Sequence, residues 1–571
     1  MTKVKQAFAG ISQYYGKSIP MSKKNKKLFY LAFFTFLLLV SIITVAIVVR
    51  VSTDNVPFTR SHAVVKVSCS SALYPELCFS AIAAEPGFTE KVSSHKDVIQ
   101  LSLNITIRAV QNNSVSLKKL QTRADLTKRA QTALEDCLKI IDHTLYALRG
   151  SISYLNDSSY HADDLKTLVS SAITDQETCL DGFSHDDKDR NVREGLGDGH
   201  LNVERMSSNA LAMIMNMTDT EDSITSGKMM EVEEEDGITW PEWILTADRR
   251  LLQASTVDAD VVVAADGSGN YTTVSEAVAA APEQSSTRYV ISIKAGVYSE
   301  IVEVPSEKTN IMFVGDGATT TIITGSQNVV DGSTTYSSAT VAIEGDGFLA
   351  RDITFENTAG PTKHQAVALR VEGDLSAFYR CNFLGYQDTL YVRINRQFFV
   401  NCLVEGTVDF IFGNSAVVFQ YCDLRARLPL SGQKNVVTAQ GRVDPNQNTG
   451  IVIQNCTIRA TQSLEAANGS VESYLGRPWK EYSRTVIMES YISDIINPAG
   501  WLAWNGTFAL DTLFYGEYQN TGPGANTSQR ILWQGFRVIT SASEALTFTP
   551  GSFISGSTWL ASTGFPYALG L

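Results

Sequence analysis

The pattern of apolar and polar positions divides the chain into two regions of different character. In residues 63–215, apolar side chains recur at three- and four-residue spacing with few Gly or Pro, as on one face of a helix. After Val257, short β-branched and aromatic runs such as DITFEN, AVALRV and RQFFVN alternate with Gly, Asn and Asp turns. The chain is therefore predicted to be helical first and rich in short strands afterwards. The clearest helical segments are expected at residues 97–109, 123–148 and 163–179.

A third pattern lies near the N-terminus. Residues 28–49 read LFYLAFFTFLLLVSIITVAIVV, which is 22 residues without a charge and long enough to cross a bilayer as a helix. Four lysines within residues 23–27 precede this stretch, and Arg50 follows it, where a cleavable signal peptide would have small residues. We predict a transmembrane signal anchor at 28–49, a cytosolic basic tail at 1–27 and a lumenal remainder.

Cysteines and glycosylation motifs agree with a secretory route. All eight cysteines follow the apolar stretch, and an even number suits an oxidising compartment. Nine N-x-[ST] motifs occur in the same part of the chain, at Asn104, Asn112, Asn156, Asn216, Asn270, Asn455, Asn468, Asn505 and Asn526. The net charge of −13 argues against nucleic acid as a partner, because phosphate binding needs a basic surface. We expect a secreted glycoprotein with disulfide bonds.

A polar stretch separates the two regions. Residues 217–254 contain the acidic run EVEEED, which is typical of a solvated linker, and approach their end with Arg249-Arg250-Leu251-Leu252. A dibasic pair often has no function, but exposed linkers are also where proteases cut. The predicted organisation is a helical domain at 60–216, a linker at 217–254 and a strand-rich domain at 255–571.

Cysteine spacing in the strand-rich region indicates its architecture. Cys381, Cys402 and Cys422 are separated by 21 and 20 residues, and each lies close to a similar strand. Such a period is typical of a parallel β-helix, in which equivalent positions stack on successive coils. Adjacent strands lie about 4.8 Å apart, which is within the usual Cα separation for a disulfide. We therefore predict a parallel β-helix, rather than a sandwich or barrel, with a Cys381–Cys402 disulfide between neighbouring coils.

The same period relates two aspartates. Asp388 follows Cys381 by seven residues and Asp409 follows Cys402 by seven, so stacked coils would place their carboxylates about 5 Å apart. Gln365 precedes Gln387 by 22 residues and would stack beside them in the same manner. Two close carboxylates resist ionising together, which leaves one as an acid and the other as a base or nucleophile. The alternative is that both aspartates only terminate turns.

Five ordered stretches then identify a family. GVYSE (296–300), QAVALRV (365–371), GYQDTLY (385–391), GTVDFIFG (406–413) and LGRPW (475–479) resemble the signature blocks of the pectin methylesterase family. The resemblance implies a right-handed parallel β-helix enzyme that releases methanol from methyl-esterified homogalacturonan (pectin) without a metal or cofactor.

The resemblance also implies a role for each matching residue. Asp409 would be the nucleophile, Asp388 the acid that becomes the base, and Gln387 with Gln365 the donors to the oxyanion. Arg477 would pair with Asp409. Substrate contacts are expected from Thr340, Gln365, Arg477 and Trp479. We expect Trp501 and Trp504 to pack in the core, and His364 to have no role as a base.

The helical region resembles a second family. YPELCFSAI around Cys78 and the spacing of four cysteines are similar to the invertase/pectin methylesterase inhibitor family. This resemblance implies a four-helix bundle with the pairs Cys69–Cys78 and Cys137–Cys179. The RRLL sequence resembles the processing site of plant pectin methylesterase precursors. The implied partners are a processing protease at Arg249-Arg250, the chain's own helical pro-domain or free inhibitor proteins, and the membrane at 28–49. We expect a monomeric mature enzyme in the cell wall.

Other functions remain open from the residues alone. A retaining glycosidase also needs carboxyl groups about 5 Å apart, although two amides suit an oxyanion better. A serine esterase is disfavoured because the chain has no G-x-S-x-G sequence, and a calcium-dependent lyase would need further acidic ligands. A non-catalytic wall-binding or inhibitor protein is the remaining alternative. The helical region could inhibit the enzyme or assist its folding and targeting.

Overall fold

The structure is a computed structural model that describes residues 59–157, 162–184, 189–225, 258–467 and 469–571. Residues 64–571 form one compact unit. The predicted tail and anchor at 1–49 and the Arg249-Arg250 pair lie outside the described residues. In the part that is described, no helix combines the length and the apolar character that crossing a bilayer requires.

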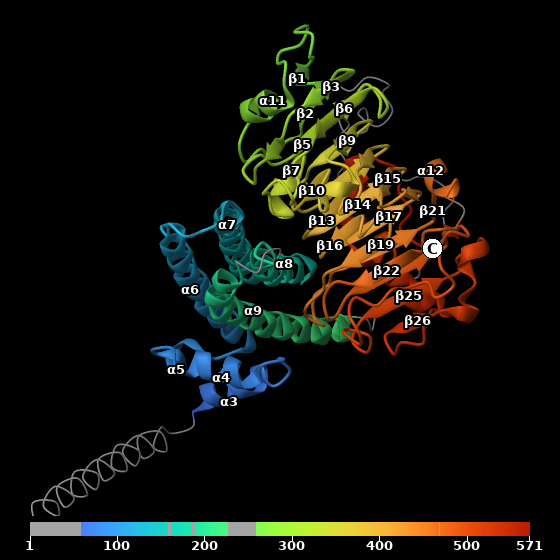
Figure 1. Ribbon diagram of the computed structural model, residues 1–571. Helices are drawn as coiled ribbons and strands as arrows, with labels where there is room; N and C mark the ends of the chain where they lie inside the picture. Colours follow the sequence, from blue (N-terminus) through green and yellow to red (C-terminus); the bar gives the residue numbers. More distant parts are fainter. Residues whose placement is uncertain (1–58, 158–161, 185–188, 226–257, 468) are drawn as a thin grey trace, which may run out of the picture. The chain divides into compact units, whose positions relative to one another are not determined.

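The first region, here called the helical half (residues 59–225), is built from α-helices, as predicted (Figure 1). Its long helices α6 to α9 pack on one another, and the predicted helical segments fall on α6, α7 and α8. Helix α9 extends into the stretch expected to be linker, so residues 217–225 are helical instead. The helices are α3 (Arg60–Cys69), α4 (Pro75–Ala83), α5 (Phe88–Lys91), α6 (His95–Gln121), α7 (Lys128–Asn156), α8 (Ala162–Asp181) and α9 (Arg190–Thr225).

Local caps and two disulfides define this half. The Ser94 hydroxyl accepts from the Asp97 backbone N–H, and the Asp97 carboxylate accepts from that of Ser94, so a capping box begins α6. Thr127 caps α7 in the same position, which is why that helix begins at Lys128 and not at residue 123. The disulfides join Cys69 to Cys78 and Cys137 to Cys179, confirming the pairing that the inhibitor resemblance implied.

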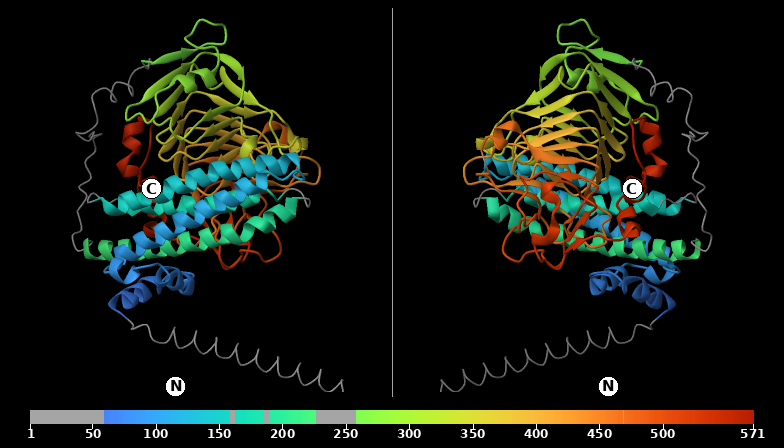
Figure 2. Two further views of the ribbon diagram at one scale, coloured as in Figure 1. Left: turned by 90° about the vertical axis from the view of Figure 1, so that its left-hand side faces the viewer. Right: turned by 90° about the vertical axis from the view of Figure 1, so that its right-hand side faces the viewer.

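The second region, here called the β-helix half (residues 258–571), is the predicted parallel β-helix (Figures 1 and 2). Its described strands form three parallel sheets. One contains β1 (Val261–Val263), β2 (Tyr289–Ile293), β5 (Ile311–Gly315), β8 (Leu349–Arg351), β11 (Ser376–Tyr379), β14 (Arg396–Val400), β17 (Ala416–Gln420), β20 (Gly450–Gln454), β23 (Arg484–Met488), β25 (Phe514–Tyr518) and β26 (Phe536–Val538). A second contains β3 (Gly296–Ser299), β6 (Thr321–Gly325), β9 (Thr354–Asn357), β12 (Asn382–Leu384), β15 (Leu403–Gly406), β18 (Asp423–Ala426), β21 (Thr457–Ala460) and β24 (Tyr491–Ile492).

The third sheet positions the site described below. It contains β4 (Val302–Val304), β7 (Val341–Ile343), β10 (Leu369–Val371), β13 (Leu390–Val392), β16 (Ile411–Gly413), β19 (Asn435–Gln440) and β22 (Ser473–Pro478). Short helices accompany the coils at α11 (Val274–Ala280), α12 (Gln462–Glu465), α13 (Ala542–Leu546), α14 (Pro550–Phe553) and α15 (Leu560–Thr563).

Phenylalanines stack on one another in the interior of the coils. Phe378, Phe399 and Phe419 occupy equivalent positions of β11, β14 and β17, and their ring centroids are 4.6 and 4.7 Å apart. These rings are buried in the interior of the β-helix. The 20- to 21-residue spacing in the sequence therefore corresponds to one coil, as the cysteine pattern predicts.

The predicted Cys381–Cys402 disulfide is wrong in one respect. The register of β12 and β15 does stack these cysteines, but both are free and buried, as are Cys422 and Cys456. Stacked Cβ atoms keep the strand spacing of about 4.8 Å, whereas a disulfide brings them to about 3.8 Å. The Cys402 thiol instead lies 3.3 Å from the Val400 carbonyl and 3.4 Å from that of Phe378. Spacing predicted the neighbours correctly but not the bond.

Candidate active site

Asp388 and Asp409 stack as predicted, each two residues before a strand of the third sheet. Leu390 of β13 pairs with Ile411 of β16, so the two aspartates occupy the same position on adjacent coils. Both have left-handed backbones, with φ of 62° and 51°, which is uncommon for residues other than glycine and is often found at functional sites. The Asp388 N–H donates to the Val408 carbonyl at 3.0 Å and fixes the register.

A glycine allows the tight turn before Asp409. Gly406 ends β15, and a Cβ atom there would lie 2.2 Å from the Cβ of Phe410 and 2.8 Å from the Tyr386 carbonyl oxygen. Those contacts are too short for any other residue type. The G of the GTVDFIFG stretch is thus required by packing next to the aspartate.

The two carboxyl groups have different electrostatic surroundings. Arg477 of β22 donates Nε to Oδ1 of Asp409 at 2.7 Å and Nη2 to Oδ2 at 2.6 Å, a bidentate pair. Its guanidinium also lies 4.2 Å from the ring centroid of Trp504. Asp388 has no such partner among the described residues. Burial, helped by the adjacent Asp409 charge, raises the pKa of Asp388 well above its usual range, against the opposing effect of Arg477. Asp388 therefore retains a proton, whereas the two hydrogen bonds from Arg477 orient the Asp409 carboxyl group.

A cavity of about 300 Å³ opens beside these groups. Gln365 and Gln387 line it, and within the described residues neither side-chain amide has a hydrogen-bond partner. Aromatic rings line the same cavity: Tyr391 and Phe412 are stacked at 4.3 Å, and Trp479 meets Phe412 edge-on at 6.0 Å. Tyr336 and Trp504 line it as well. The cavity thus combines free amide donors, two carboxyl groups and an aromatic wall.

Sequence reasoning identified most of this site but not all of it. Thr340 does not line the cavity, because it is fully buried and its hydroxyl donates to the Glu356 carbonyl at 2.9 Å. Trp501 is buried in the core as expected, whereas Trp504 lines the cavity and corrects the expectation for that residue. His364, on an exposed turn, does not line it.

Three aromatic residues of the cavity, Tyr336, Tyr391 and Phe412, were not predicted from the sequence. Tyr391 and Phe412 are 21 residues apart, the same period that relates Asp388 to Asp409, and they lie on adjacent strands of the third sheet. The period would have paired them too, had it been applied to every position of these two coils. In the described part of the chain, no group of three or more His, Cys, Asp or Glu residues is arranged to hold a metal ion.

Known proteins with similar sequences cover both halves. Residues 260–557 match the Pectinesterase family, and residues 63–213 match the family described as plant invertase/pectin methylesterase inhibitor. The chain is 60% identical to pectinesterase 3 of Citrus sinensis, with the whole of both proteins covered. The chain belongs to the pectinesterase family. It is therefore an ester hydrolase that acts on the methyl esters of pectin, as the sequence motifs implied.

Other relatives contain one or both halves of this pectinesterase. Pectinesterase/pectinesterase inhibitor U1 of Solanum lycopersicum is 58% identical and aligns over 98% of this chain and 100% of its own. The pectinesterase of Daucus carota is 70% identical but covers 56% of this chain, with 100% of its own length aligned. The solved structure of the carrot pectin methylesterase superposes with a TM-score of 0.55 over the same 56%. A β-helix half without a helical counterpart is thus a folded protein in a close relative.

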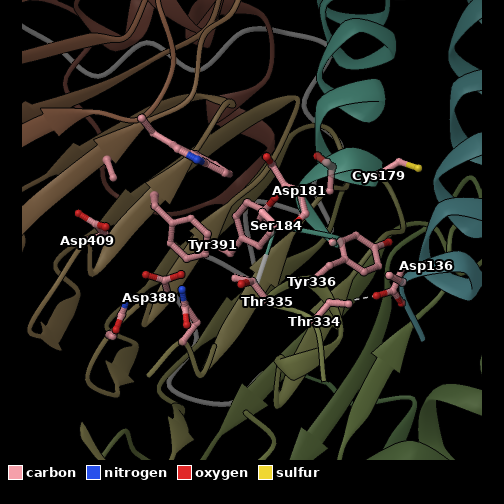
Figure 3. Close-up of a pocket in the computed structure, with 18 of the residues that line it drawn as sticks. Asp136, Cys179, Asp181, Ser184, Thr334, Thr335, Tyr336, Asp388, Tyr391 and Asp409 are labelled. Atoms are coloured by element: carbon pink, nitrogen blue, oxygen red, sulfur yellow. Dashed lines mark hydrogen bonds between the residues drawn. The ribbon is translucent and has the colours of Figure 1, made fainter. Parts of the chain in front are cut away.

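In this pectinesterase the helical half contributes to the walls of the catalytic cavity (Figure 3). Asp136 of α7 and Asp181 of α8 lie across the cavity from Asp388 and Asp409. Other residues of this half that line the cavity are Ala133, Thr178, Cys179, Gly182 and Ser184. Asp136 accepts a hydrogen bond from Thr334 of the β-helix half at 2.5 Å.

Helix α8 also supplies acids to cations of the β-helix half. Asp164 accepts from Arg396 at 2.7 Å, and Asp175 accepts from the fully buried Arg393 at 2.8 Å. Lys480 donates to two further carboxylates of α8, which are described below. Acids on one helix thus meet cations distributed over several coils of the pectinesterase half.

Proposed function

We propose that this pectinesterase acts through Asp409 as nucleophile and Asp388 as general acid and base. The observation that carries the proposal is the stacked pair itself, in which one carboxylate is bound by Arg477 and the other holds a proton. Such a division of two carboxyl groups between an acidic and an ionised role is set by environment.

The first chemical step forms a covalent intermediate. An ionised oxygen of Asp409 attacks the carbonyl carbon of the methyl ester, and the negative charge passes to the carbonyl oxygen. The unpartnered amides of Gln365 and Gln387 donate hydrogen bonds to that oxyanion, a type of contact that contributes about 3 kcal/mol to the transition state. When the carbonyl reforms, the C–O bond to methoxide breaks, and Asp388 gives its proton to methanol. A mixed anhydride between Asp409 and the galacturonate remains.

The second step regenerates the enzyme. Asp388, now ionised, accepts a proton from water, which attacks the anhydride carbonyl. The bond to Asp409 breaks, leaving a galacturonic acid group, an ionised Asp409 and a protonated Asp388. The new acid group loses its proton to solvent and becomes the free galacturonate carboxylate. Arg477 binds both oxygens of Asp409 between turnovers and keeps the attacking oxygen directed at the cavity.

Methanol and new reducing ends, followed together from methyl-esterified polygalacturonan, test this proposal. We expect the fragment 258–571 to release methanol without new reducing ends, and Asp409→Asn to abolish the release. Reducing ends without methanol would instead mean that the aspartates serve a glycosidase. Release of no methanol and no reducing ends would favour a wall-binding protein.

A second role is proposed for the helical half, which is inhibition of the enzyme within the same chain. Its support is the cavity wall: residues of α7 and α8 stand where a polymer chain must lie to reach Asp388 and Asp409. Release would follow cleavage at Arg249-Arg250 in the secretory pathway, with residues 28–49 as the anchor and the cell wall as the destination of a monomeric mature enzyme.

The buried Arg393–Asp175 pair offers a test of this role. Asp175→Asn removes the buried carboxylate of the helical half that meets Arg393 and leaves Glu372 as the other partner of that guanidinium. The cost should therefore not exceed about 3–5 kcal/mol, which is that of a fully broken buried pair. The full chain carrying Asp175→Asn should release methanol at a measurable rate where the unchanged chain does not. Asp164→Asn is the milder control, because the Asp164 side chain is 23% exposed whereas that of Asp175 is fully buried. Equal activity of the cut and uncut chains would rule out inhibition and favour a role in folding or targeting.

A further inference from the structure

Lys480 is a cation whose acidic partners all come from the other half of the molecule. It follows Trp479, and its Nζ lies 5.3 Å from the centroid of that ring. Nζ donates to Oδ1 of Asp181 at 3.0 Å and to Oε2 of Glu177, both on α8. Its side chain is only 15% exposed, although it is on the surface of the β-helix half that α8 covers.

The other cations under α8 differ from Lys480 in one respect. Arg393 is paired with Glu372 and Arg396 with Asp374, both within the β-helix half. Lys480 has no carboxylate of the β-helix half within ion-pair distance among the described residues. Removal of the helical half therefore leaves Arg393 and Arg396 paired but leaves Lys480 without a counterion, beside the catalytic cavity.

Asp181 shows where a carboxylate can lie between Lys480 and that cavity. It is one of the residues that line the cavity, and it also accepts from Lys480. Trp479 connects the same two places, since its ring lines the cavity while the Lys480 ammonium lies near it. A carboxylate at the position of the Asp181 side chain would therefore belong to a polymer that also reaches Asp388 and Asp409.

We propose that Lys480 is a binding subsite for an unesterified galacturonate carboxylate of the substrate chain, and that Asp181 and Glu177 occupy this subsite in the uncut protein. In the uncut protein these two carboxylates of α8 thus take the place of carboxylates of polygalacturonate. The subsite gives the enzyme a preference for esters whose neighbours along the polymer are already free acids. This inference rests on the proposed esterase function and adds a substrate preference to it.

The expected size of the effect follows from the kind of contact. A hydrogen bond to a charged group is stronger than one between neutral groups, and solvent around an open groove reduces its contribution. A preference of about five- to tenfold is therefore expected, since tenfold corresponds to about 1.4 kcal/mol. Salt should weaken it, because an exposed pair is screened within about 10 Å at 0.1 M ionic strength.

The experiment uses the fragment 258–571, whose carrot counterpart is folded without a helical half. Methanol release is measured on two polygalacturonans of equal length, one fully methyl-esterified and one about half de-esterified. For Lys480→Met, kcat/KM on the half-esterified polymer should fall about five- to tenfold, and on the fully esterified polymer less than about twofold. Lys480→Arg should keep most of the preference. Lys294→Met is the matched control, because it removes an exposed lysine that pairs with Asp316 outside the cavity.

Each outcome bears on the subsite. An equal fall in kcat/KM on both polymers, or no fall on either, would overturn the proposed subsite. Activity of the variant on the fully esterified polymer shows that it is folded. A fragment that releases no methanol from either polymer would defeat the proposed esterase function, which is a different result from an unselective Lys480→Met. In the full chain, the same substitution should raise activity, because α8 loses one of its anchors.

Discussion

The two halves of this pectinesterase bring their important residues together by different means. In the β-helix half, residues that are one coil apart in the sequence become neighbours, so Asp388 meets Asp409 and Cys381 meets Cys402. In the helical half, contacts join segments at irregular distances, and a disulfide links Cys137 to Cys179. Contacts between residues one coil apart can therefore be predicted from the sequence, whereas contacts between helix faces become known only from the structure.

The largest expected effect comes from removing the proton-carrying member of the stacked pair in the β-helix half. Asp388→Asn keeps the shape but cannot carry the proton, and general acid–base catalysis contributes about 10²- to 10⁴-fold to rate. We expect kcat for methanol release by fragment 258–571 to fall by about 10³-fold. Asp352→Asn is the matched control, since Asp352 has the same left-handed backbone, with φ of 59°, but does not line the cavity. Equal losses in both variants would mean that the turn, and not the proton, matters.

The next effect separates the stabilities of the two halves. Cys137 and Cys179 are 42 residues apart in the sequence, and replacing both by Ala removes their cross-link. From the loop-closure entropy of the unfolded chain, we expect the free energy of unfolding to fall by about 4 kcal/mol. Urea unfolding should then show the helical half melting first, while the tryptophan signal of the β-helix half, which contains Trp501, keeps its midpoint. A shared shift of both transitions would show that the halves unfold as one cooperative unit.

The sequence was sufficient for the contacts that follow a period and insufficient for the others. The strand-rich and helical character of the halves, the stacked aspartates and the neighbouring Gln365 and Gln387 follow from such patterns. The Arg477 pair follows no period, and its prediction came from the family resemblance of the LGRPW stretch. The motif gave the neighbourhood of Thr340 but not the direction of its side chain, which donates to the Glu356 carbonyl, so its substrate contact stays a prediction.

Partnerships between the two halves were outside the reach of sequence reasoning. Lys480 follows the LGRPW stretch directly, yet nothing in its spacing indicates that Glu177 and Asp181, some 300 residues away, are its partners. The same holds for Arg393 and Asp175. Such pairs depend on how two separately folded surfaces meet, and a single sequence carries no period or motif for that.

The affinity of the helical half for the β-helix half should depend on pH, with an effect of intermediate size. Burial raises the pKa of Asp136 to about 6, against the opposing effects of its Thr334 hydrogen bond and of Arg370. An exposed aspartate has a pKa of about 3.9, so the docked state binds the extra proton between these values. Binding of the two halves is therefore tightest below about pH 4. Their dissociation constant should rise by up to tenfold per pH unit as the pH rises to about 6.

The measurement needs the two halves as separate chains, obtained by one cut within residues 226–257 of the full protein. Their dissociation constant is compared at pH 4.5, 5.5 and 7. Asp136→Asn stays neutral at every pH and should flatten this dependence, with Asp142→Asn on the same helix as the control. An unchanged pH dependence in Asp136→Asn would assign the effect to other groups at the interface.

The smallest expected effect concerns the cysteines, which are free thiols in the described β-helix half and form disulfides in the helical half. Cys402 is stacked between Cys381 and Cys422 as a free thiol, and burial raises the pKa of this thiol, so it stays protonated and unreactive. Cys402→Ala removes one buried sulfur and should lower the free energy of unfolding by only about 1 kcal/mol. That is a fraction of the loss expected for the Cys137–Cys179 pair. A reducing agent should likewise shift the helical transition and leave the β-helix transition in place. If reduction destabilised the β-helix half by as much as replacing Cys137 and Cys179 destabilises the helical half, the stacked thiols would have to be bonded, and stacking by register would no longer suffice to hold the coils together.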